Sequence, residues 1–447
     1  MTDYWSPELE TKPWSEVQAW QAQCVSEAVP RIRETSRLYA GLLAETGDVT
    51  INAFEDLQRL PFTGKEHLKN AQADASATEP FGANQAAPLV DIVQTVSSSG
   101  TSGVPLYYPV TRADVAMWTD AIAQNFFTAG IRREDVIAHL VGLPGVAGGL
   151  PYAEAFREIG ATLCWLGGFP TERILREMRR LHTTALLATT SFGTYLSETW
   201  DEVGETTGIE SSLRKVLCGG EPGLDQPAIR HKIETGLGID GLREVMGMGD
   251  VIPGMWGECD VADGMHFNAQ RYVAVELIDP DSGEPVPWSA GATGELVYTT
   301  FQRDAAPLIR YRSRDHAQVV DVACACGRTS PRLRCIGRTD DMLIYKGMNV
   351  FPTAIRDVVA ESFAGRLEPT LRIWKAYKDL VRFDEAIPVD VEACEGLAAA
   401  SYPAIAGALE SAVRSQMQVR IRVTVLEPGG LPRGAYKNAL VAVRENK

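Results

Sequence analysis

Short apolar segments alternate with helical segments between residues 115 and 198. DVIAHLVGL, ATLCWLG and TALLAT are typical of buried strands, whereas PYAEAFREIG and TERILREMRRLH have the apolar spacing of amphipathic helices. Parallel strands are joined by crossovers of about a dozen residues or more, and a helix usually forms them. LRKVLCGGEP and GLREVMGMGD predict two further strands that end in glycine-rich turns. This order predicts an α/β fold built on a parallel sheet.

The remaining segments predict a second fold style and a second domain. Residues Pro13 to Thr46 predict helix, interrupted at Pro30. The alternation in YVAVELIDPDSGEPVP and GELVYTT predicts antiparallel strands. A chain of 447 residues is too long for one hydrophobic core. We predict a large N-terminal domain over residues 1–339, with layered α/β structure and a β subdomain at about 255–335, and a small mobile α+β C-terminal domain over residues 340–447.

Composition restricts the partners. The formal net charge of -15 argues against nucleic acid and anionic membranes. The start of the chain lacks the basic flank and apolar run of a signal peptide, and no apolar stretch reaches the roughly 18 residues of a membrane span. We therefore expect a cytoplasmic protein, a monomer or a homodimer, whose eight cysteines are reduced.

A loop rich in glycine and hydroxyl side chains follows the predicted strand DIVQTV. It is TVSSSGTSGVPLYY, from Thr95 to Tyr108. Glycines allow backbone N–H groups to converge on one point, and the hydroxyls add donors, so such a loop can hold the phosphates of ATP. It is not a Walker loop, because the Gly-Lys-Ser/Thr ending is missing. The alternative is a flexible Ser/Gly linker.

Four further segments decide between these two interpretations. The loop resembles the phosphate loop of the adenylate-forming superfamily, and CGGEP, MGMGD, IRYRSRD and IGRTDDMLIYKGMNVFP resemble that superfamily's other motifs in the same order. LPFTGKEHL, CACGRTSPRL and GMNVFPTAI are in the style of phenylacetate–CoA ligases. The resemblance covers nearly the whole chain. It implies that a carboxylate attacks the α-phosphate of ATP to give acyl-AMP and pyrophosphate, and that a thiol then displaces AMP.

The resemblance also implies a nucleotide site, with ATP and Mg²⁺ as cofactors. Asp250 stands where the family carries a Glu near Mg²⁺, Asp315 would accept bonds from the ribose hydroxyls, and Arg338 would reach the sugar or a phosphate. The alternatives are a turn residue for Asp250 and a surface salt bridge for Arg338. The implied nucleotide-binding residues are Ser98, Ser99, Gly100, Thr101, Ser102, Gly103, Gly220, Glu221, Pro222, Met246, Gly247, Asp250, Asp315 and Arg338.

Three residues near or within the C-terminal segment match functional positions of the family. Lys437 resembles the lysine that enters the site during adenylation, where it would act with Asp250 and Thr101 in catalysis. The alternative is a solvated lysine near the chain end. Asp340 matches the hinge, and Gly347 matches the tunnel for the pantetheine arm of coenzyme A, where a side chain would block a narrow thiol.

Four positions depart from the family pattern. Val104 replaces the usual Lys of the phosphate loop, and Met246 replaces a Tyr that would stack on adenine. Asp250 is one methylene shorter than Glu, and Tyr436 precedes Lys437 where Gly is common. These departures bear on the rate and on the acceptor of the acyl group.

Cysteine and histidine form a separate candidate metal site. Cys324 and Cys326 form a Cys-x-Cys pair, and Cys259 and His266 bound an upstream loop. Three thiols and one imidazole make a ligand set for structural zinc. Phenylacetate–CoA ligase relatives have Cys and His at matching positions, and some bind zinc there. The alternative is a group of reduced, buried cysteines, and Cys335 could replace one ligand. We expect the others in the core: Cys24, Cys164, Cys218 and Cys394.

The family's acid pocket corresponds to GLPGVAGGLPY, WLGGFPTER, ATTSFGTY and GGEP. These segments supply Val146, Phe169, Phe192 and Tyr195, and an apolar slot with an aromatic lip suits an aryl or arylalkyl acid. The leading hypothesis is therefore an acid–CoA ligase. An alternative acceptor is a carrier-protein thiol, or AMP could activate nitrite for diazotisation of an aryl amine. A nucleotide-binding homologue that has lost catalysis is a third hypothesis.

Overall fold

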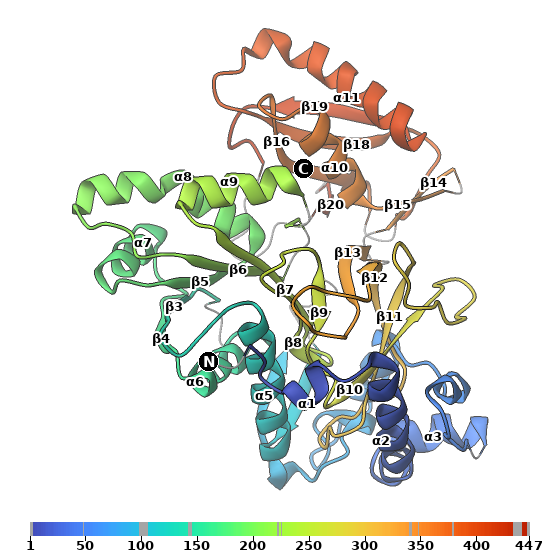
Figure 1. Cartoon of the computed structure of the whole chain (residues 1–447). Helices are drawn as coiled ribbons and strands as arrows, with labels where there is room; N and C mark the ends of the chain where they lie inside the picture. Colours follow the sequence, from blue (N-terminus) through green and yellow to red (C-terminus); the bar gives the residue numbers. More distant parts are fainter. Residues whose placement is uncertain are drawn as a thin grey trace.

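The structure, a computed structural model, describes residues 3–47, 49–97, 106–141, 145–220, 223–224, 226–338, 342–346, 348–377, 380–431 and 440–444. It has a large N-terminal domain and a smaller C-terminal domain, which confirms the predicted mixed α/β class. In Figure 1 the small domain, orange to red, lies beyond the end of the large domain that carries α9 and β13. No helix among the described residues is long and apolar enough to cross a bilayer.

The N-terminal segment is helical, but its break is not at Pro30. Helix α2 runs through Pro30 and ends at Thr35. Ser36 then caps the next helix by accepting a hydrogen bond from the Tyr39 N–H, and buried Ile32 continues the apolar face past the proline. Core packing therefore keeps the helix intact. The helices and strands up to the phosphate loop are α1 (Pro7–Glu10), α2 (Trp14–Thr35), α3 (Arg37–Thr46), η1 (Phe54–Arg59), α4 (Lys65–Ala73), η2 (Gly82–Asn84), η3 (Leu89–Asp91) and β1 (Ile92–Ser97).

The predicted parallel sheet is confirmed. Strands β3, β5, β6 and β7 are parallel neighbours, and β4 pairs with β3 on the outer edge. The elements of this region are β2 (Tyr107–Thr111), α5 (Arg112–Thr128), β3 (Val136–His139), α6 (Leu150–Ile159), β4 (Thr162–Trp165), α7 (Thr171–Arg180), β5 (Ala185–Ala188), α8 (Thr190–Thr207), β6 (Lys215–Gly219), α9 (Pro227–Leu237) and β7 (Gly241–Met248).

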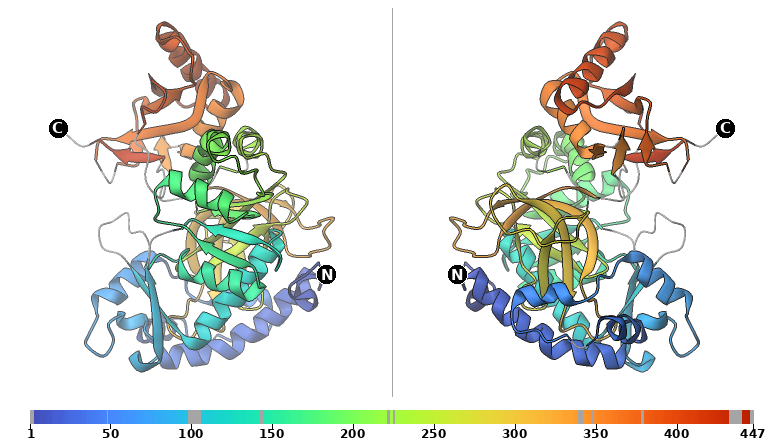
Figure 2. Two further views of the ribbon diagram at one scale, coloured as in Figure 1. Left: turned by 90° about the vertical axis from the view of Figure 1, so that its left-hand side faces the viewer. Right: turned by 90° about the vertical axis from the view of Figure 1, so that its right-hand side faces the viewer.

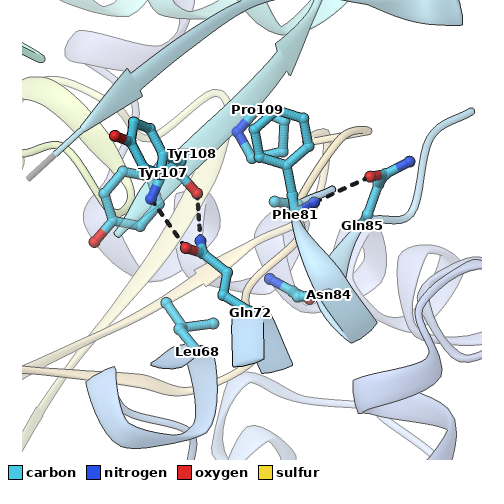
Figure 3. Close-up of a pocket in the computed structure, with 9 residues that line it drawn as sticks. Leu68, Gln72, Phe81, Asn84, Gln85, Tyr107, Tyr108 and Pro109 are labelled. Carbon is cyan, nitrogen blue, oxygen red and sulfur yellow. Dashed lines mark hydrogen bonds between the residues drawn. The ribbon is translucent and has the colours of Figure 1, made fainter. Parts of the chain in front are cut away.

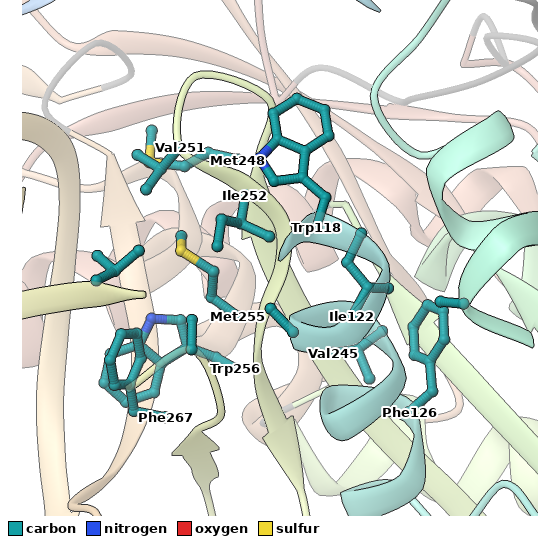
Figure 4. Packing of buried hydrophobic residues seen from close by; sticks show 14 of the residues in the cluster. Trp118, Ile122, Phe126, Val245, Met248, Val251, Ile252, Met255, Trp256 and Phe267 are labelled. Carbon is teal, nitrogen blue, oxygen red and sulfur yellow. The ribbon is translucent and has the colours of Figure 1, made fainter. Parts of the chain in front are cut away.

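Alternate residues of the strands face two different helix layers. Ile137 and Leu187 pack with α5 and α6, whereas Ala138, Leu186 and Val216 pack with α7, α8 and α9. Figure 4 shows the first layer, where Trp118, Ile122 and Phe126 of α5 face side chains of β7–β9. A strand buried on both faces is apolar throughout, which is why the runs in the sequence are continuous.

The antiparallel strands extend the same sheet. Its order is β10-β11-β12-β13-β9-β8-β7-β6-β5-β3-β4, and the change of direction occurs where β7 turns into β8. The turn between β7 and β8 thus lies where the parallel part of the sheet meets the antiparallel part. The strands are β8 (Ile252–Glu258), β9 (Met265–Phe267), β10 (Val273–Ile278), β11 (Thr293–Thr300), β12 (Tyr311–Asp321) and β13 (Arg332–Arg338).

The small domain has its own core, formed by residues between Leu343 and Val441. A four-stranded sheet of order β19-β18-β16-β20 packs against α10 and α11, with a three-stranded sheet beside it. The two views of Figure 2 show this domain set apart from the helices and sheet of the large domain. The predicted boundary at residues 339–340 lies outside the described residues. The elements are β14 (Leu343–Tyr345), β15 (Met348–Val350), α10 (Pro352–Ser362), β16 (Leu367–Lys375), β17 (Arg382–Phe383), β18 (Ile387–Ala393), η5 (Ala399–Ser401), α11 (Tyr402–Met417), β19 (Ile421–Leu426) and β20 (Val441–Val443).

Candidate functional site

Asp315 and Arg338 face each other across the ladder between β12 and β13. They are register partners, and Nη1 of Arg338 donates to Oδ1 of Asp315 at 2.6 Å. Arg338 Nη2 also donates to the carbonyl oxygen of Ser313 at 3.3 Å. Asp315 is buried at 5% exposure. Strand pairing thus brings together a carboxylate and a guanidinium that the sequence placed 23 residues apart.

Asp250 lies in the turn between β7 and β8, at the point where the sheet changes from parallel to antiparallel. Burial raises the pKa of its carboxyl group, and the positive charges of Lys65 and Arg338 act in the opposite direction. Tyr311 hydrogen-bonds to the Asp250 carboxyl group. The Oδ1 atom of Asp250 is buried and has no hydrogen-bond partner among the described residues. A buried carboxylate oxygen without a donor suits a divalent cation.

Arg303 is a site residue that the sequence analysis missed. Its side chain is fully buried, and Nη1 donates to the carbonyl oxygens of Asp250 and Val251. Arg303 therefore fixes the turn that carries Asp250. A buried arginine has no local sequence signature, because its acceptors lie more than 50 residues away along the chain.

Several of the predicted site residues fall outside the described part of the chain. They are Ser98, Ser99, Gly100, Thr101, Ser102, Gly103, Val104, Glu221, Pro222, Asp340, Gly347, Tyr436 and Lys437. The described residues on either side of the predicted phosphate loop belong to β1 and β2, which pair as an antiparallel hairpin. Gly220 follows β6 with φ of 83°, a conformation that favours glycine.

Two contacts hold the base of this hairpin. Ser97, the last residue of β1, donates its N–H to the carbonyl oxygen of Gly145 at 2.7 Å and forms a bridge with Val146. Gln72 of α4 bonds both backbone groups of Tyr107, the first residue of β2. Figure 3 shows the latter contact in a small pocket. That pocket shares no lining residue with the Asp250, Asp315 and Arg338 group.

Met246 and Gly247 end the parallel part of the sheet beside Asp250. Met246 is partly buried and packs against the main core. A Cβ at position 247 would collide with the carbonyl oxygen of Pro253. The close approach of β7 and β8 therefore requires glycine there, whatever ligand the turn holds.

The predicted acid-pocket residues come from helix α8 and from two loops. Phe192 and Tyr195 lie on the first turns of α8, with ring centroids 6.1 Å apart. Val146 is tied to Ser97 at the phosphate loop. Phe169 is 38% exposed and stacks under the guanidinium of Arg173 at 3.9 Å.

His139 lies near the loop that carries Val146, and the sequence analysis missed it. It ends β3 and is fully buried between the rings of Trp165 and Phe156. Its Nε2 lies 3.1 Å from the carbonyl oxygen of Gly149, which caps α6, while its Nδ1 has no partner within the described residues. Burial lowers the pKa of His139 to about 4. The neutral ring therefore donates from Nε2 and fixes the loop that carries Val146.

The four predicted metal ligands are brought together. Their ligand atoms all lie within 4.8 Å of one another. The Sγ atoms of Cys259 and Cys324 are 3.7 Å apart, and Sγ of Cys326 is 3.4 Å from Nε2 of His266. Tetrahedral zinc with bonds of about 2.3 Å to sulfur and 2.0 Å to nitrogen requires separations of about 3.8 and 3.5 Å. The geometry therefore fits zinc.

The surroundings of the cluster favour ligation as well. The Nδ1 atom of His266 is 3.0 Å from the carbonyl oxygen of Ser330, which leaves Nε2 directed at the sulfurs. A hydrogen bond with Cys259 lowers the pKa of Cys326, and the pKa of Cys259 is raised in turn. Cys326 is thus poised to ionise first, and thiolate is the form that binds metal.

No family model matches the chain, but known proteins do. A phenylacetate–coenzyme A ligase of Thermus thermophilus is 33% identical over 79% of this chain and 78% of the relative. One of Pseudomonas putida is 32% identical over 76% and 73%. A crystal structure of 2-hydroxyisobutyryl-CoA ligase in the postadenylation state aligns with a TM-score of 0.87 at 25% identity, covering 99% of this chain and 93% of that chain. The TM-score is 0.70 for that ligase in the thioesterification state, at 24% identity and coverage of 99% and 92%.

We predict that His139→Gln flattens the acid side of the stability profile. Unfolding releases the ring to a pKa near 6.5, so the unfolded chain takes up a proton that the folded chain binds only near pH 4. Stability due to this group is full above about pH 6.5 and falls towards pH 4, by about 3 kcal/mol in all. Thermal unfolding midpoints between pH 4 and 8 measure it. Exposed His67→Gln is the control, and parallel profiles for wild type and His139→Gln would contradict the prediction.

Proposed function

Because this chain belongs to the phenylacetate–coenzyme A ligase family, we propose that it activates an aryl or arylalkyl acid with ATP and transfers the acyl group to coenzyme A. The family assignment confirms the resemblance inferred from the motifs. The observation that carries the proposal is the proximity of Asp250 to Arg338 and, through Tyr311, to Asp315 at one edge of the sheet.

In the first step the acid's carboxylate attacks the α-phosphorus of ATP, and pyrophosphate leaves. Asp315 accepts hydrogen bonds from the ribose hydroxyls, and Arg338, partly exposed beside it, reaches the sugar or a phosphate. Asp250 would hold Mg²⁺ through its unpartnered Oδ1. A bound Mg²⁺ offsets the charge of the triphosphate. The positive charges of Lys65 and Arg338 oppose the effect of burial, which still leaves the pKa of the Asp250 carboxyl group raised.

The remaining roles follow from the resemblance. The phosphate loop from Ser98 to Gly103 would hold the β- and γ-phosphates by backbone N–H groups, with Thr101 adding a hydroxyl. Lys437 would stabilise the charge that develops at the α-phosphate. In the second step a thiol that enters past Gly347 attacks the acyl carbon, and AMP leaves. Rotation about Asp340 would present Lys437 and Gly347 in turn.

The aromatic residues predicted for the acid site support an aromatic substrate. Phe192 and Tyr195 form an aromatic pair at the start of α8. Trp165, at the end of β4, is 39% exposed and lies beside the buried ring of His139. Rings of this kind bind a flat apolar group well, and a few polar atoms then fix its orientation. Phenylacetate, the acid named for the relatives, is therefore the first substrate to test.

We predict that a panel of aryl and arylalkyl acids will release pyrophosphate from ATP, and that free coenzyme A will convert the products to thioesters. Pyrophosphate release and thioester absorbance measure the two steps, with acetate as the control acid. Pyrophosphate release without dependence on coenzyme A would favour a carrier-protein thiol or another acceptor. Absence of pyrophosphate release with every acid would favour a homologue that has lost catalysis.

We predict that Lys437→Ala and Gly347→Trp affect different half-reactions. Lys437→Ala should slow adenylate formation by ~10²-fold or more, because it removes a cation from the transition state. It should leave the reaction of supplied acyl-adenylate with coenzyme A nearly unchanged. Gly347→Trp should block that second reaction and preserve pyrophosphate release. Equal slowing of both steps by Lys437→Ala would make the lysine structural.

We propose that Cys259, His266, Cys324 and Cys326 bind one structural zinc ion. The support is that their ligand atoms all lie within 4.8 Å of one another and that Cys259 and His266 are buried. The site has four protein ligands and no open position, so it is not a catalytic site.

We predict one zinc per chain in metal analysis of the purified protein. Cys324→Ser should lower the thermal unfolding midpoint by about 5 °C or more, because bound metal stabilises the folded state. Turnover measured at low temperature should change less. Cys24→Ser, on helix α2 outside the cluster, is the control. A metal content of zero in the wild type would contradict the proposal.

A further inference from the structure

Lys232 connects the two domains. It lies on α9 of the large domain, and its Nζ is 2.8 Å from Oε2 of Glu368 on β16 of the small domain. The same Nζ is 3.0 Å from Oε1 of Glu198 on α8. Lys232–Glu368 is thus an ion pair between the two domains.

The three side chains are partly shielded from solvent. Their side-chain exposures are 30% for Lys232, 25% for Glu368 and 35% for Glu198. Burial opposes the charge on Lys232, but the two carboxylates outweigh it and raise its pKa. Glu368 also acts on Cys394 of the small domain, whose thiol pKa burial and this carboxylate raise to about 11. The ammonium therefore stays charged between two carboxylates from different domains.

The domain arrangement that contains this pair resembles one of several known for a ligase of the same fold. The chain aligns better with 2-hydroxyisobutyryl-CoA ligase in the postadenylation state than with the same ligase in the thioesterification state. Both alignments cover 99% of this chain, so the same two domains are matched in each. The lower TM-score therefore reflects a different arrangement of the domains. Glu198 and Lys232 lie on packed neighbours α8 and α9, so they stay together when the small domain moves, whereas Glu368 moves away.

We propose that Lys232 is a positioning residue that holds the small domain, through Glu368, in the pose that resembles the postadenylation state, and that acyl-adenylate formation takes place in or close to that pose. The half-reaction part of this proposal rests on the proposed function. Glu198 is the permanent partner of Lys232. When the domains rearrange for thioester formation, Lys232 keeps one carboxylate, so release of Glu368 does not leave an unpaired ammonium in a partly shielded place. The pair thus favours one pose without preventing the other.

Charge reversal tests the pair. Lys232→Glu places three carboxylates together, so attraction between the two domains becomes repulsion. We expect this change to shift the equilibrium between the two domain arrangements about tenfold. We expect adenylate formation from phenylacetate to slow about tenfold, while thioester formation from supplied phenylacetyl-adenylate is unchanged or faster. Lys232→Glu with Glu368→Lys restores one ammonium between two carboxylates, and both rates should return to within about twofold of wild type.

Small-angle X-ray scattering of the same proteins gives a readout that needs no substrate. Lys232→Glu should broaden the distance distribution, and the double variant should restore it. Lys69→Glu, a reversal on exposed helix α4, is the matched control and should change neither readout. Unchanged scattering for Lys232→Glu, or failure of the double variant to restore it, would overturn the proposal. If wild type activates no acid while scattering responds as expected, the proposed function fails and the domain contact stands.

Discussion

A single buried guanidinium holds together the segments on which the site depends. Arg303 is fully buried, donates to the turn that carries Asp250, and lies over the ring of Trp118 on α5. Removing such a charge from water is costly, and burial lowers the pKa of Arg303 even though Asp114 and Asp250 act against this. Asp114 in turn accepts the N–H groups of Asp304 and Ala305. The start of α5, the loop before β12 and the β7–β8 turn are therefore fixed as a unit.

This arrangement leaves the Asp250 carboxylate in an unfavourable place. Its raised pKa means that the folded chain binds a proton there more tightly than the unfolded chain does. The stability that the protonated carboxyl group contributes is therefore lost as the pH rises through its folded-state pKa. A cation bound at Oδ1 would offset this cost, because it favours the charged form and stabilises the folded state. The shorter Asp, in place of the Glu common in the family, keeps the carboxylate close to the turn that Arg303 fixes.

Sequence reasoning succeeded where a local pattern carries the structure. The apolar runs predicted the parallel strands, and the ligand types together with the family resemblance predicted the cluster of Cys259, His266, Cys324 and Cys326. It failed where the decisive contact is distant. The acceptors of Arg303 lie more than 50 residues away, and the partner of Lys232 is 136 residues away. Nothing near these residues in sequence distinguishes them from surface charges. The helix break predicted at Pro30 was wrong for the opposite reason. Here a local helix breaker is present, but packing against a core formed by distant residues keeps the helix intact.

Strand β13 connects the cysteine cluster to the Asp315–Arg338 pair, where we propose that the nucleotide binds. At its start Arg332 pairs in register with His266 of β9, and at its end Arg338 pairs with Asp315 of β12. The loop before β13 carries Cys324 and Cys326, and it is held to the N-terminal segment by the ion pair of Arg328 with Glu10. A metal bound at the cluster would join β9 to this loop and so fix the register of β13. Because a slip of one residue moves every side chain of a strand to the opposite face, the position of Arg338 beside Asp315 depends on that register.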